Sequence, residues 1–417
     1  AQGTATDPIV FTSIDALTTD LDKTDTGLWG GIIVLGKGRI NGNVSGSWAG
    51  DYPTNSAEGV SPATGDDSLI IYGGTDDTDD SGVISYVSIR HGGVILGAGK
   101  EINGLTLCAV GSATQVDHVE VYANKDDGIE IFGGNVNLDH IVLAYCYDDS
   151  LDLDEGYRGS VQYLLAIQDF VSSDVTDKGG EWDGADLPVK GTPEMMIHLA
   201  NATFIGLGDK AANTALNIRV NGAAKVYNSI FTEYDKMLKI DADSTDRFNA
   251  GDIVFAGNIW HSSTEANTTP ALLQTGAEAC KSDGFFTSNN NQIANPGLTV
   301  TRDANGTITT AGAIDVTPAV GSIAATSPGA TVSADPVQTN FIGAFSPYYN
   351  WALGWTKLYD DGTFAVEGTW FNHPKWGWLW LSSGSLAEGG YVYFQNTDQW
   401  VWIALEDASG YWTYTFK

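Results

Sequence analysis

The strongest constraint on the fold is a stretch of sequence that repeats with a period of about 22 residues. VDHVEVYANKDDGIEI (116–131) aligns without a gap with LDHIVLAYCYDDSLDL (138–153), and VQYLLA (161–166) is a weaker third copy at nearly the same interval. Periods of roughly 20 to 50 residues are typical of solenoids, in which each copy stacks on the previous one. The sequence therefore predicts a stack of similar coils.

Apolar and polar residues alternate within each copy. Val119 and Val121 flank Glu120, and such a period of two indicates a strand with one buried face. Helical repeats would space their apolar residues three and four apart, and leucine-rich repeats would carry a ladder of Leu and Asn. The pattern therefore predicts an all-β fold, a right-handed parallel β-helix with coils of about 22 residues. Further candidate coils are 69–74, 84–93, 102–107, 196–206, 216–234 and 253–260.

Changes in composition divide the chain into four predicted parts. They are an N-terminal cap segment at 1–27, the parallel β-helix at 28–262, an extended covering segment at 263–345 and a Trp-rich β-meander module at 346–417. The covering segment is rich in Thr, Ala, Ser, Asn and Gly and shows little periodicity, which is why it is separated from the coils.

The last part is marked by aromatic residues, because nine of the 13 Trp lie between positions 351 and 412. Trp side chains two residues apart share one face of a strand, which predicts a small antiparallel aromatic-rich module. Its aromatics could form its own core, a carbohydrate platform, or an interface with another copy or with the cell surface. The candidate binding or interface residues are Trp376, Trp378, Trp380, Trp400, Trp402 and Trp412.

The chain carries 52 acidic and 20 basic side chains, a formal net charge of −32. A surface of this sign repels nucleic acid and anionic lipid and gathers cations, so we expect no nucleic-acid partner and regard divalent ions as natural ligands. No stretch approaches the roughly 18 consecutive apolar residues of a spanning helix, so no transmembrane segment is expected.

Location and redox state give weaker signals. The sequence opens AQGTATDPIVF, without an initiator Met or a leader, as a mature secreted protein would, and we expect an extracellular, cell-surface location. Three cysteines cannot form a disulfide scaffold. Cys108 and Cys146 fall into different stacks of the repeat, so both are expected to be buried free thiols.

Acidic residues recur at the same place in both strong copies of the repeat. Asp126 and Asp127 return as Asp148 and Asp149, and equivalent residues of a β-helix stack about 4.8 Å apart. At that distance two carboxylates repel by about 1 kcal/mol in water and about 3.5 kcal/mol at an effective dielectric near 20. Two interpretations stay open: a Ca²⁺ ion that gathers these oxygens, or turn capping by backbone N–H groups. The candidate metal ligands are Asp126, Asp127, Glu130, Asp148, Asp149, Asp152 and Asp154.

Other polar groups receive simpler interpretations. The acidic run GGTDDTDDSG (73–82) lacks the strict spacing of calcium-binding β-rolls and is expected to be a solvated loop. His118 and His140 occupy equivalent positions of the repeat. We expect them to pack and hydrogen-bond on the outer face of the coils rather than to bind metal.

Three segments resemble a family of secreted right-handed β-helix proteins found in Bacteroidetes and other, often marine, bacteria. They are GLWGGIIVLGKGRING (27–42), the stretch from EINGLTL to LLAIQD (101–169) and FIGAFSPYYNWALGWTKL (341–358). The resemblance implies the fold and an extracellular location, with a Trp-rich C-terminal surface module after the solenoid. It transfers no catalytic residue.

The leading hypothesis is an extracellular structural or adhesive protein, stabilised by calcium and able to self-associate into a layer or filament. The alternatives are a Ca²⁺-dependent polysaccharide lyase or glycoside hydrolase, and a carbohydrate-binding module. A lyase would use Arg158 or Lys125 as the base, and a hydrolase would pair Asp126 or Asp127 with another acid. A non-enzymatic role is favoured, and no residue is assigned as catalytic.

Overall fold

The structure of the chain is a computed structural model. The chain divides into two compact units, Ala1–Thr363 and Phe364–Lys417. From residue 366 onward the description covers the backbone. The structure describes all residues except 42–52, 63, 98–99, 171–176, 186–190, 210–212, 263–271, 273–284, 310–311, 320, 327–328, 333–335, 348, 366–367, 374–376, 383–389, 395–398, 406–411 and 415–417.

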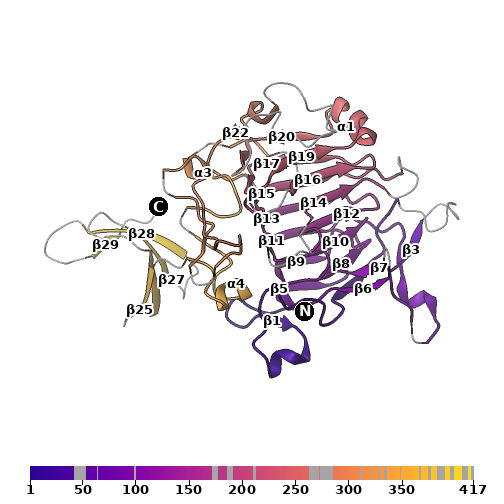
Figure 1. Cartoon of the computed structure of the whole chain (residues 1–417), viewed down its shortest axis with the longest axis horizontal. Coiled ribbons are helices and arrows are strands. Elements are labelled where there is room, and N and C mark those ends of the chain that lie inside the picture. Colours follow the sequence, from indigo (N-terminus) through magenta and orange to yellow (C-terminus); the bar gives the residue numbers. More distant parts are fainter. Residues whose placement is uncertain are drawn as a thin grey trace. The chain divides into compact units, whose positions relative to one another are not determined.

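The first unit is built on two stacks of parallel strands (Figure 1). The long sheet contains, in spatial order, β1 (Ile9–Phe11), β5 (Val83–Arg90), β9 (Gln115–Tyr122), β11 (Asn137–Ala144), β13 (Ser160–Ile167), β15 (Ile197–Ile205), β18 (Ile230–Thr232), β21 (Ile259–His261) and β22 (Gln292–Ile293), with β17 (Ala224–Tyr227) and β20 (Val254–Ala256) paired alongside. The short sheet contains β2 (Ile32–Leu35), β8 (Leu105–Cys108), β10 (Ile129–Phe132), β12 (Leu151–Asp154), β14 (Lys178–Asp183), β16 (Thr214–Arg219) and β19 (Lys236–Ile240).

The pairing of these strands follows the sequence repeat. Val119 pairs with Ile141 in the long sheet, and Glu130 pairs with Asp152 in the short sheet, so both pairs join the positions that the repeat aligns. The chain therefore alternates between the two sheets as it climbs the stack, and the predicted parallel β-helix is confirmed.

The long sheet turns a corner in the middle of its longest strands. Tyr86, His118, His140 and Tyr163 interrupt β5, β9, β11 and β13, and they adopt left-handed backbone conformations with φ of 48°, 49°, 54° and 59°. Asn201 and Asn228 continue this column in the next coils, with φ of 52° and 50°. Side chains on the two arms of each strand therefore face different directions. These six residues are called the corner column below.

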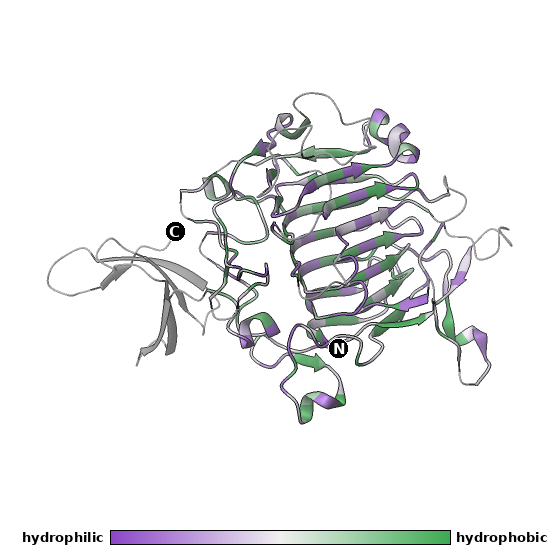
Figure 2. Ribbon diagram, in the orientation of Figure 1, coloured by the Kyte–Doolittle hydropathy of each residue, from purple (hydrophilic) through white to green (hydrophobic). Residues whose placement is uncertain are grey.

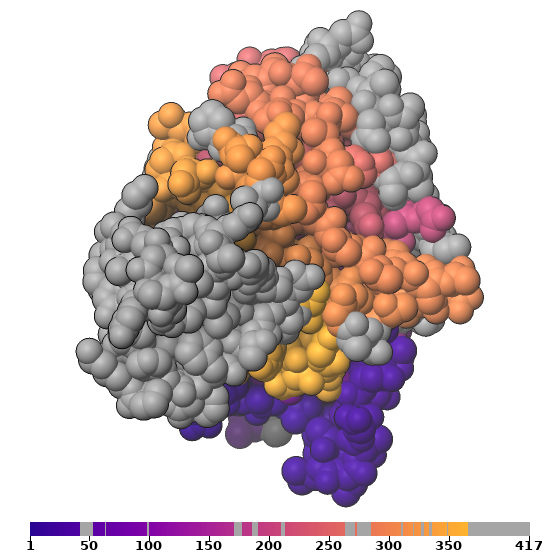
Figure 3. Space-filling model, turned by 90° about the vertical axis from the view of Figure 1, so that its left-hand side faces the viewer, coloured from indigo at the N-terminus to yellow at the C-terminus, as the bar shows by residue number. Residues whose placement is uncertain are grey.

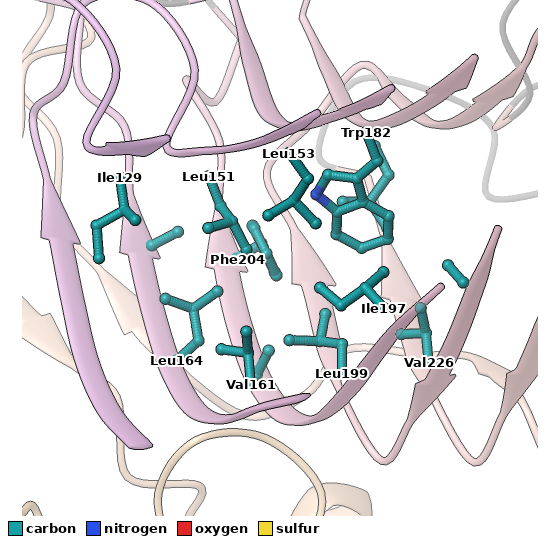
Figure 4. Close-up of a cluster of buried hydrophobic side chains, with 14 of the residues drawn as sticks. Ile129, Leu151, Leu153, Val161, Leu164, Trp182, Ile197, Leu199, Phe204 and Val226 are labelled. Atoms are coloured by element: carbon teal, nitrogen blue, oxygen red, sulfur yellow. The ribbon is translucent and has the colours of Figure 1, made fainter. Parts of the chain in front are cut away.

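The core lies between the two sheets. In Figure 4, Ile129, Leu151 and Leu153 of the short sheet point toward Val161 and Leu164 of the long sheet. All of these side chains are buried, and each fully buried aliphatic chain contributes about 1.5 to 3 kcal/mol. Apolar and polar residues alternate along the strands (Figure 2), so the outer face of the short sheet is left for polar side chains.

Further elements decorate the coils. They are η1 (Ile14–Leu17), the β3–β4 hairpin (Thr54–Ser56 and Ile71–Gly73) with η2 (Asp67–Ile70) in its loop, the β6–β7 hairpin (Val94–Gly97 and Lys100–Ile102), η3 (Ala242–Ser244), α1 (Thr245–Ala250), η5 (Phe285–Thr287), the β23–β24 pair (Thr299–Val300 and Ile314–Asp315), α3 (Ile323–Thr326) and α4 (Lys357–Asp360). The prediction of a coil at 69–74 is wrong, because β4 pairs antiparallel with β3 and its strand belongs to a hairpin.

The segments flanking the coils also join the long sheet. β1, from the predicted cap segment, pairs in parallel with β5, and β22, from the predicted covering segment, pairs in parallel with β21. In Figure 3 the orange residues of the later part of the chain cover one face of the first unit. None of the helices in the described part of the chain has the length and apolar character needed to cross a bilayer.

The second unit is an antiparallel meander. Its strands pair in chain order as β25 (Gly368–His373), β26 (Gly377–Ser382), β27 (Gly390–Phe394), β28 (Gln399–Leu405) and β29 (Trp412–Tyr414). The register places Trp370, Trp380, Tyr393 and Trp400 opposite one another in a row across four strands.

The remaining predicted interface residues lie on the same strands or outside the description. Trp378 lies opposite Asn372, Trp402 opposite Tyr391, and Trp412 opposite Leu405. Trp376 lies outside the described residues. The binding role of these tryptophans stays a prediction.

Two aromatic residues and two thiols of the first unit bear on the sequence analysis. Trp351 and Trp355 belong to the first unit and are buried there, so the described division falls later than position 346. Cys108 and Cys146 are free and buried, as predicted. Cys280 lies outside the described residues.

Candidate metal centre

Three copies of one acidic motif stack where the chain enters the short sheet. They read DDGIE (126–130), DDSLD (148–152) and DKGGE (177–181). Their last residues, Glu130, Asp152 and Glu181, are paired in register on β10, β12 and β14. The motif is therefore a ladder that climbs three coils, and it is called the acidic ladder below.

Backbone N–H groups hold one oxygen of the ladder in each of its first two coils. The N–H of Asp149 donates to Asp127 Oδ1 at 2.8 Å, and the N–H of Lys178 donates to Asp149 Oδ1 at 2.7 Å. Each aspartate thus joins its own coil to the next, which is the turn-capping role that the sequence left open. The other carboxylate oxygens are not used by these two bonds.

Those carboxylates converge within the first two coils. One oxygen each from Asp126, Asp127 and Asp148 lie within 4.8 Å of one another, and so do oxygens of Asp127, Glu130 and Asp152. A third such group joins Asp148 and Asp149 to Asp177, one coil later. Asp126 is 5% exposed and Asp127 8% exposed, so water screens their mutual repulsion poorly.

Burial and mutual repulsion shift the protonation of these groups. Burial, followed by the charges of Asp148, Glu101 and Glu58, raises the pKa of Asp126 to about 7. Burial and the neighbouring carboxylates also raise the pKa of Asp127, Glu130 and Asp152 well above the ordinary range. The first two coils therefore bind protons unusually well, and a metal cation would compete for the same oxygens.

The donor atoms fit a hard cation. Asp126 Oδ2 is buried and has no hydrogen-bond partner in the described structure, and the same holds for the side-chain oxygens of Asn103 and Asn124. The Asn103 amide donates to Glu130, which brings another oxygen-bearing side chain to the ladder. Carboxylate and amide oxygens are the ligands that Ca²⁺ prefers, and the three acid groups contain neither His nor Cys.

The third coil of the ladder has its own cations. Lys178 Nζ lies 3.0 Å from Glu181 Oε1 and 3.9 Å from Asp149 Oδ2, and it also pairs with Asp177. Arg219 NH2 lies 2.7 Å from the other oxygen of Glu181. Burial lowers the pKa of Lys178, but Asp149, Asp177 and Glu181 together raise it by more. The Lys178 ammonium therefore stays charged.

Sequence reasoning found most of the ladder and missed its surroundings. Asp126, Asp127, Glu130, Asp148, Asp149 and Asp152 are brought together as predicted. Asp154 belongs to none of the three acid groups in the described structure, and its carboxylate accepts the N–H of Glu155 at 2.5 Å. Glu58 and Glu101 act on Asp126 from outside the repeat, near β3 and on β7, where no periodic signal marks them.

Lys178 and Arg219 were also missed. DKGGE aligns with DDSLD, but it follows after a longer interval than the one that separates DDSLD from DDGIE, so a fixed period does not reveal it. Arg219 is found only through the pairing of β14 with β16, which places it opposite Asp183.

Arg158 and Lys125, the two predicted lyase bases, do not lie together at the acidic ladder. Arg158 binds Asp77 at 2.9 Å and the Gly156 carbonyl at 2.9 Å. Lys125 lies over the Tyr147 ring, 5.0 Å from its centroid, and its charge slightly opposes the rise in the pKa of Asp126. The predicted stack of His118 and His140 is present, with ring centroids 4.5 Å apart.

A comparison with known families agrees with this architecture. A family model described as a pectate-lyase-like β-helix domain matches residues 1–308. The chain belongs to this family. No curated protein and no solved structure compared with the chain matches it. Membership of the pectate-lyase-like β-helix family fits a polysaccharide-acting protein or a surface protein, and it assigns neither role.

Proposed function

We propose that this chain is an extracellular structural or adhesive surface protein whose β-helix is stabilised by Ca²⁺ bound at the acidic ladder. The observation that carries the proposal is the convergence of Asp126, Asp127 and Asp148, with the buried Asp126 Oδ2 lacking a partner among the described residues. Asp126 and Asp127 are buried, and buried carboxylates at this spacing need a counter-charge.

The chemistry favours Ca²⁺ over other common ions. The acid groups offer oxygen ligands, which argues against Zn²⁺ and other ions that prefer His and Cys. Ca²⁺ accepts six to eight oxygens in flexible geometry, whereas Mg²⁺ usually keeps several waters. Asp126 and Asp127 are buried, which favours an ion that gives up its water shell more readily.

A structural role fits the position of the site. An ion between Asp126 and Asp148 would join two successive coils, as the bond from Asp149 N–H to Asp127 already does. It would also reduce the repulsion within a chain of net charge −32. The ends of a β-helix carry strand edges that can pair with another copy, so a stiffened solenoid is suited to self-association.

The aromatic unit supports a surface role. The register of its meander aligns Trp370, Trp380 and Trp400 across neighbouring strands. Such rows suit contact with another copy, a cell-surface component or a sugar ring. We assign this unit to attachment, as the resemblance to secreted β-helix proteins with Trp-rich surface modules implies.

Light scattering on the full chain tests the proposal. Molar mass is measured in millimolar Ca²⁺ and after chelation, and calorimetry measures Ca²⁺ binding directly. The wild type should bind Ca²⁺ and form a larger species in its presence, whereas Asp126→Asn combined with Asp127→Asn should do neither. A matched control is Asp79→Asn combined with Asp80→Asn, which removes two loop acids outside the ladder. Absence of Ca²⁺ binding by the wild type would overturn the proposal.

A second candidate, a polysaccharide-acting enzyme, is favoured by Lys178 and Arg219. These cations stand beside the acidic ladder on the short sheet, and the Arg219 side chain is 40% exposed. Burial lowers the pKa of Arg219, but its acidic neighbours raise it by more, so the guanidinium stays charged and could bind the carboxylate of a uronate sugar beside the proposed metal site.

Incubation with uronate polymers, monitored by the absorbance of unsaturated products, tests this candidate. Turnover lost in Arg219→Ala and Asp149→Ala, but retained in Arg158→Ala, would establish the enzyme. Arg158 is a matched control because it pairs with Asp77 instead of the ladder. Absence of turnover in the wild type across uronate polymers would count against an enzymatic role.

A further inference from the structure

Four rings of the corner column form a continuous pile along the coils. Tyr86 stacks on His118 with centroids 4.2 Å apart, His118 on His140 at 4.5 Å, and His140 on Tyr163 at 4.6 Å. The two imidazoles are almost parallel, with an interplanar angle of 4°. Two ionisable rings therefore lie face to face inside a column of aromatic rings.

A segment far away in the sequence covers this pile. Residues 349–361, called the strap below, precede the second unit and include α4; Figure 3 shows them as a golden patch between the orange residues and the indigo N-terminal segment. Trp351 packs edge-to-face against His140, 4.9 Å between centroids, and Trp355 against His118 at 5.9 Å. The two indoles are 5% and 1% exposed, so the strap excludes water from one side of the imidazoles.

The lower end of the strap is held by polar contacts. Glu120 is fully buried and accepts the N–H groups of Lys357 at 2.7 Å and Leu358 at 3.3 Å. The Tyr122 hydroxyl donates to Asp361 at 2.8 Å. The strap is thus held both by polar contacts, of which those to Glu120 are buried, and by the packing of its indoles on the two histidines.

The packing of the strap on the histidines depends on charge. Each imidazole has its Nδ1 next to the preceding aspartate, at 2.9 Å for His118 and Asp117, and His140 bonds Asp139 in the same way. Burial beneath the indoles lowers the pKa of His118, its hydrogen bond to Asp117 raises the pKa, and the neighbouring His140 ring lowers it. Opening the strap would let water solvate the protonated His118 ring.

We propose that the strap is a pH-sensitive clasp, closed over the stacked rings of His118 and His140 and released when the His118 imidazole takes up a proton. This device goes beyond the proposed function and does not depend on Ca²⁺. Release would uncover the ring column and free the segment that leads into the second unit.

The direction of the linkage agrees with the geometry. Burial lowers the pKa of His118, so proton uptake favours the state in which this ring is hydrated. Glu120 acts in the opposite sense, because burial raises its pKa and proton uptake there favours the closed strap. The ionisable groups that face the histidines and the strap are Tyr86 and Arg90 on β5, Asp117, Glu120 and Tyr122 on β9, Asp139 on β11, Tyr163 on β13, and Lys357, Asp360 and Asp361 on the strap.

Hydrogen–deuterium exchange on the full chain tests the clasp. Protection of the amides of 349–361 is compared at about pH 7.5 and about pH 5, after correction for the intrinsic exchange rate. We expect protection to fall by at least about tenfold at the lower pH, because the His118 ring takes up a proton on opening. Peptides from β10 and β12 serve as the internal reference and should stay protected.

The matched variant is His118→Tyr combined with His140→Tyr. The chain itself uses Tyr86 and Tyr163 at the neighbouring positions of the column, with similar left-handed backbone, so rings and conformation are kept and the titration is removed. This variant should keep the strap protected at both pH values. If its strap is already open at the higher pH, His118→Asn combined with His140→Asn replaces it, since Asn201 and Asn228 show that Asn fits the column.

Two results would overturn the proposal. One is equal protection of the wild-type strap at both pH values. The other is an equal loss of protection in the variants without the histidines, which would assign the transition to carboxylates. Glu120→Gln separates the two kinds of contact, because it should retain the pH-dependent opening if the histidines cause it.

Discussion

The first two coils of the acidic ladder and its third coil share one backbone arrangement and differ in their counter-charge. In the third coil, position 178 is a lysine whose ammonium lies 3.0 Å from Glu181. In the first two coils the equivalent positions are Asp127 and Asp149, and Asp127 lies among Asp126, Asp148, Glu130 and Asp152. One substitution in a repeated motif thus separates a neutralised region from one that concentrates negative charge.

The difference bears on where we propose that an external cation binds. A buried carboxylate is stable only when its charge is paired, bound to metal or removed by a proton. The third coil uses pairing, through Lys178 and Arg219. The first two coils have raised pKa values instead, which means that protons occupy the place of the missing charge at low pH. At neutral pH the proposed metal ion would take that place.

The largest expected effect comes from removing the internal cation. Lys178→Met leaves Asp149 and Glu181 without their ammonium partner, and breaking a buried pair in this way costs about 3 kcal/mol of unfolding free energy. Urea unfolding in chelator measures the loss. Lys239→Met is the control, because Lys239 pairs with Asp241 at a more exposed place and should cost less than about 1 kcal/mol.

A second substitution at the same position sharpens the comparison. Lys178→Asp turns DKGGE into DDGGE and so extends the acidic pattern of the first two coils into the third. In chelator it should destabilise the chain at least as much as Lys178→Met, but Ca²⁺ should restore part of the loss only in the Asp variant. Equal responses of the two variants to Ca²⁺ would mean that the added carboxylate does not extend the metal site into the third coil.

A pH series should give the next largest effect. The pKa of Asp126 rises from its ordinary value of 3.8 to about 7 in the folded chain, so its contribution to stability is fully present below the unfolded value and is lost as the pH rises through about 7. In chelator, unfolding free energy attributable to the first two coils should fall by about 2 to 3 kcal/mol between about pH 5 and about pH 7.5.

The difference between wild type and Asp126→Asn isolates this contribution, because His118 and Glu120 titrate in both chains. This difference in unfolding free energy should depend less on pH when Ca²⁺ is added, since the ion stabilises the ionised carboxylates. If, in chelator, the unfolding free energy of the wild type rises with pH relative to that of Asp126→Asn, the Asp126 carboxylate is paired with a positive charge that the distances do not show.

Asp127→Asn should have a smaller effect, with a sign that depends on the solution. The amide oxygen can still accept the N–H of Asp149, while the charge facing Glu130 and Asp152 is gone. In chelator we expect a gain of about 1 to 2 kcal/mol in unfolding free energy, and in Ca²⁺ we expect the ion-dependent stabilisation to vanish. Destabilisation under both conditions would assign Asp127 to turn capping alone.

The sequence predicted the parts of this picture that repeat. The alignment of Val119 with Ile141 and of Glu130 with Asp152 follows from the fixed period, because one coil of a solenoid dictates the register of the next. Most of the acidic ladder was predicted for the same reason. Alternation of apolar residues likewise predicted which side chains fill the core.

The parts that do not repeat escaped prediction. Lys178 follows an insertion that breaks the period, and Glu58 and Glu101 come from segments outside the coils. An apolar run such as LIIYGG (69–74) fits a coil and a hairpin equally well, since period alone does not reveal the partner strand. Composition grouped Trp351 and Trp355 with the aromatic module, yet they cover the corner column of the first unit.

The smallest effect is expected in the acidic loop 73–82, and it tests whether acid density alone explains the ladder. Asp80 accepts the Gly82 N–H at 2.9 Å and Asp79 accepts the Ser81 hydroxyl at 2.8 Å, so these carboxylates cap turns in an exposed loop. Asp79→Asn combined with Asp80→Asn should change unfolding free energy by less than about 0.5 kcal/mol and leave Ca²⁺ stabilisation intact. Calorimetric titration with Ca²⁺ measures this. If these substitutions weaken Ca²⁺ binding as much as Asp126→Asn does, the ion responds to the overall negative charge of the chain. The difference between the first two coils and the third coil would then not explain where Ca²⁺ binds.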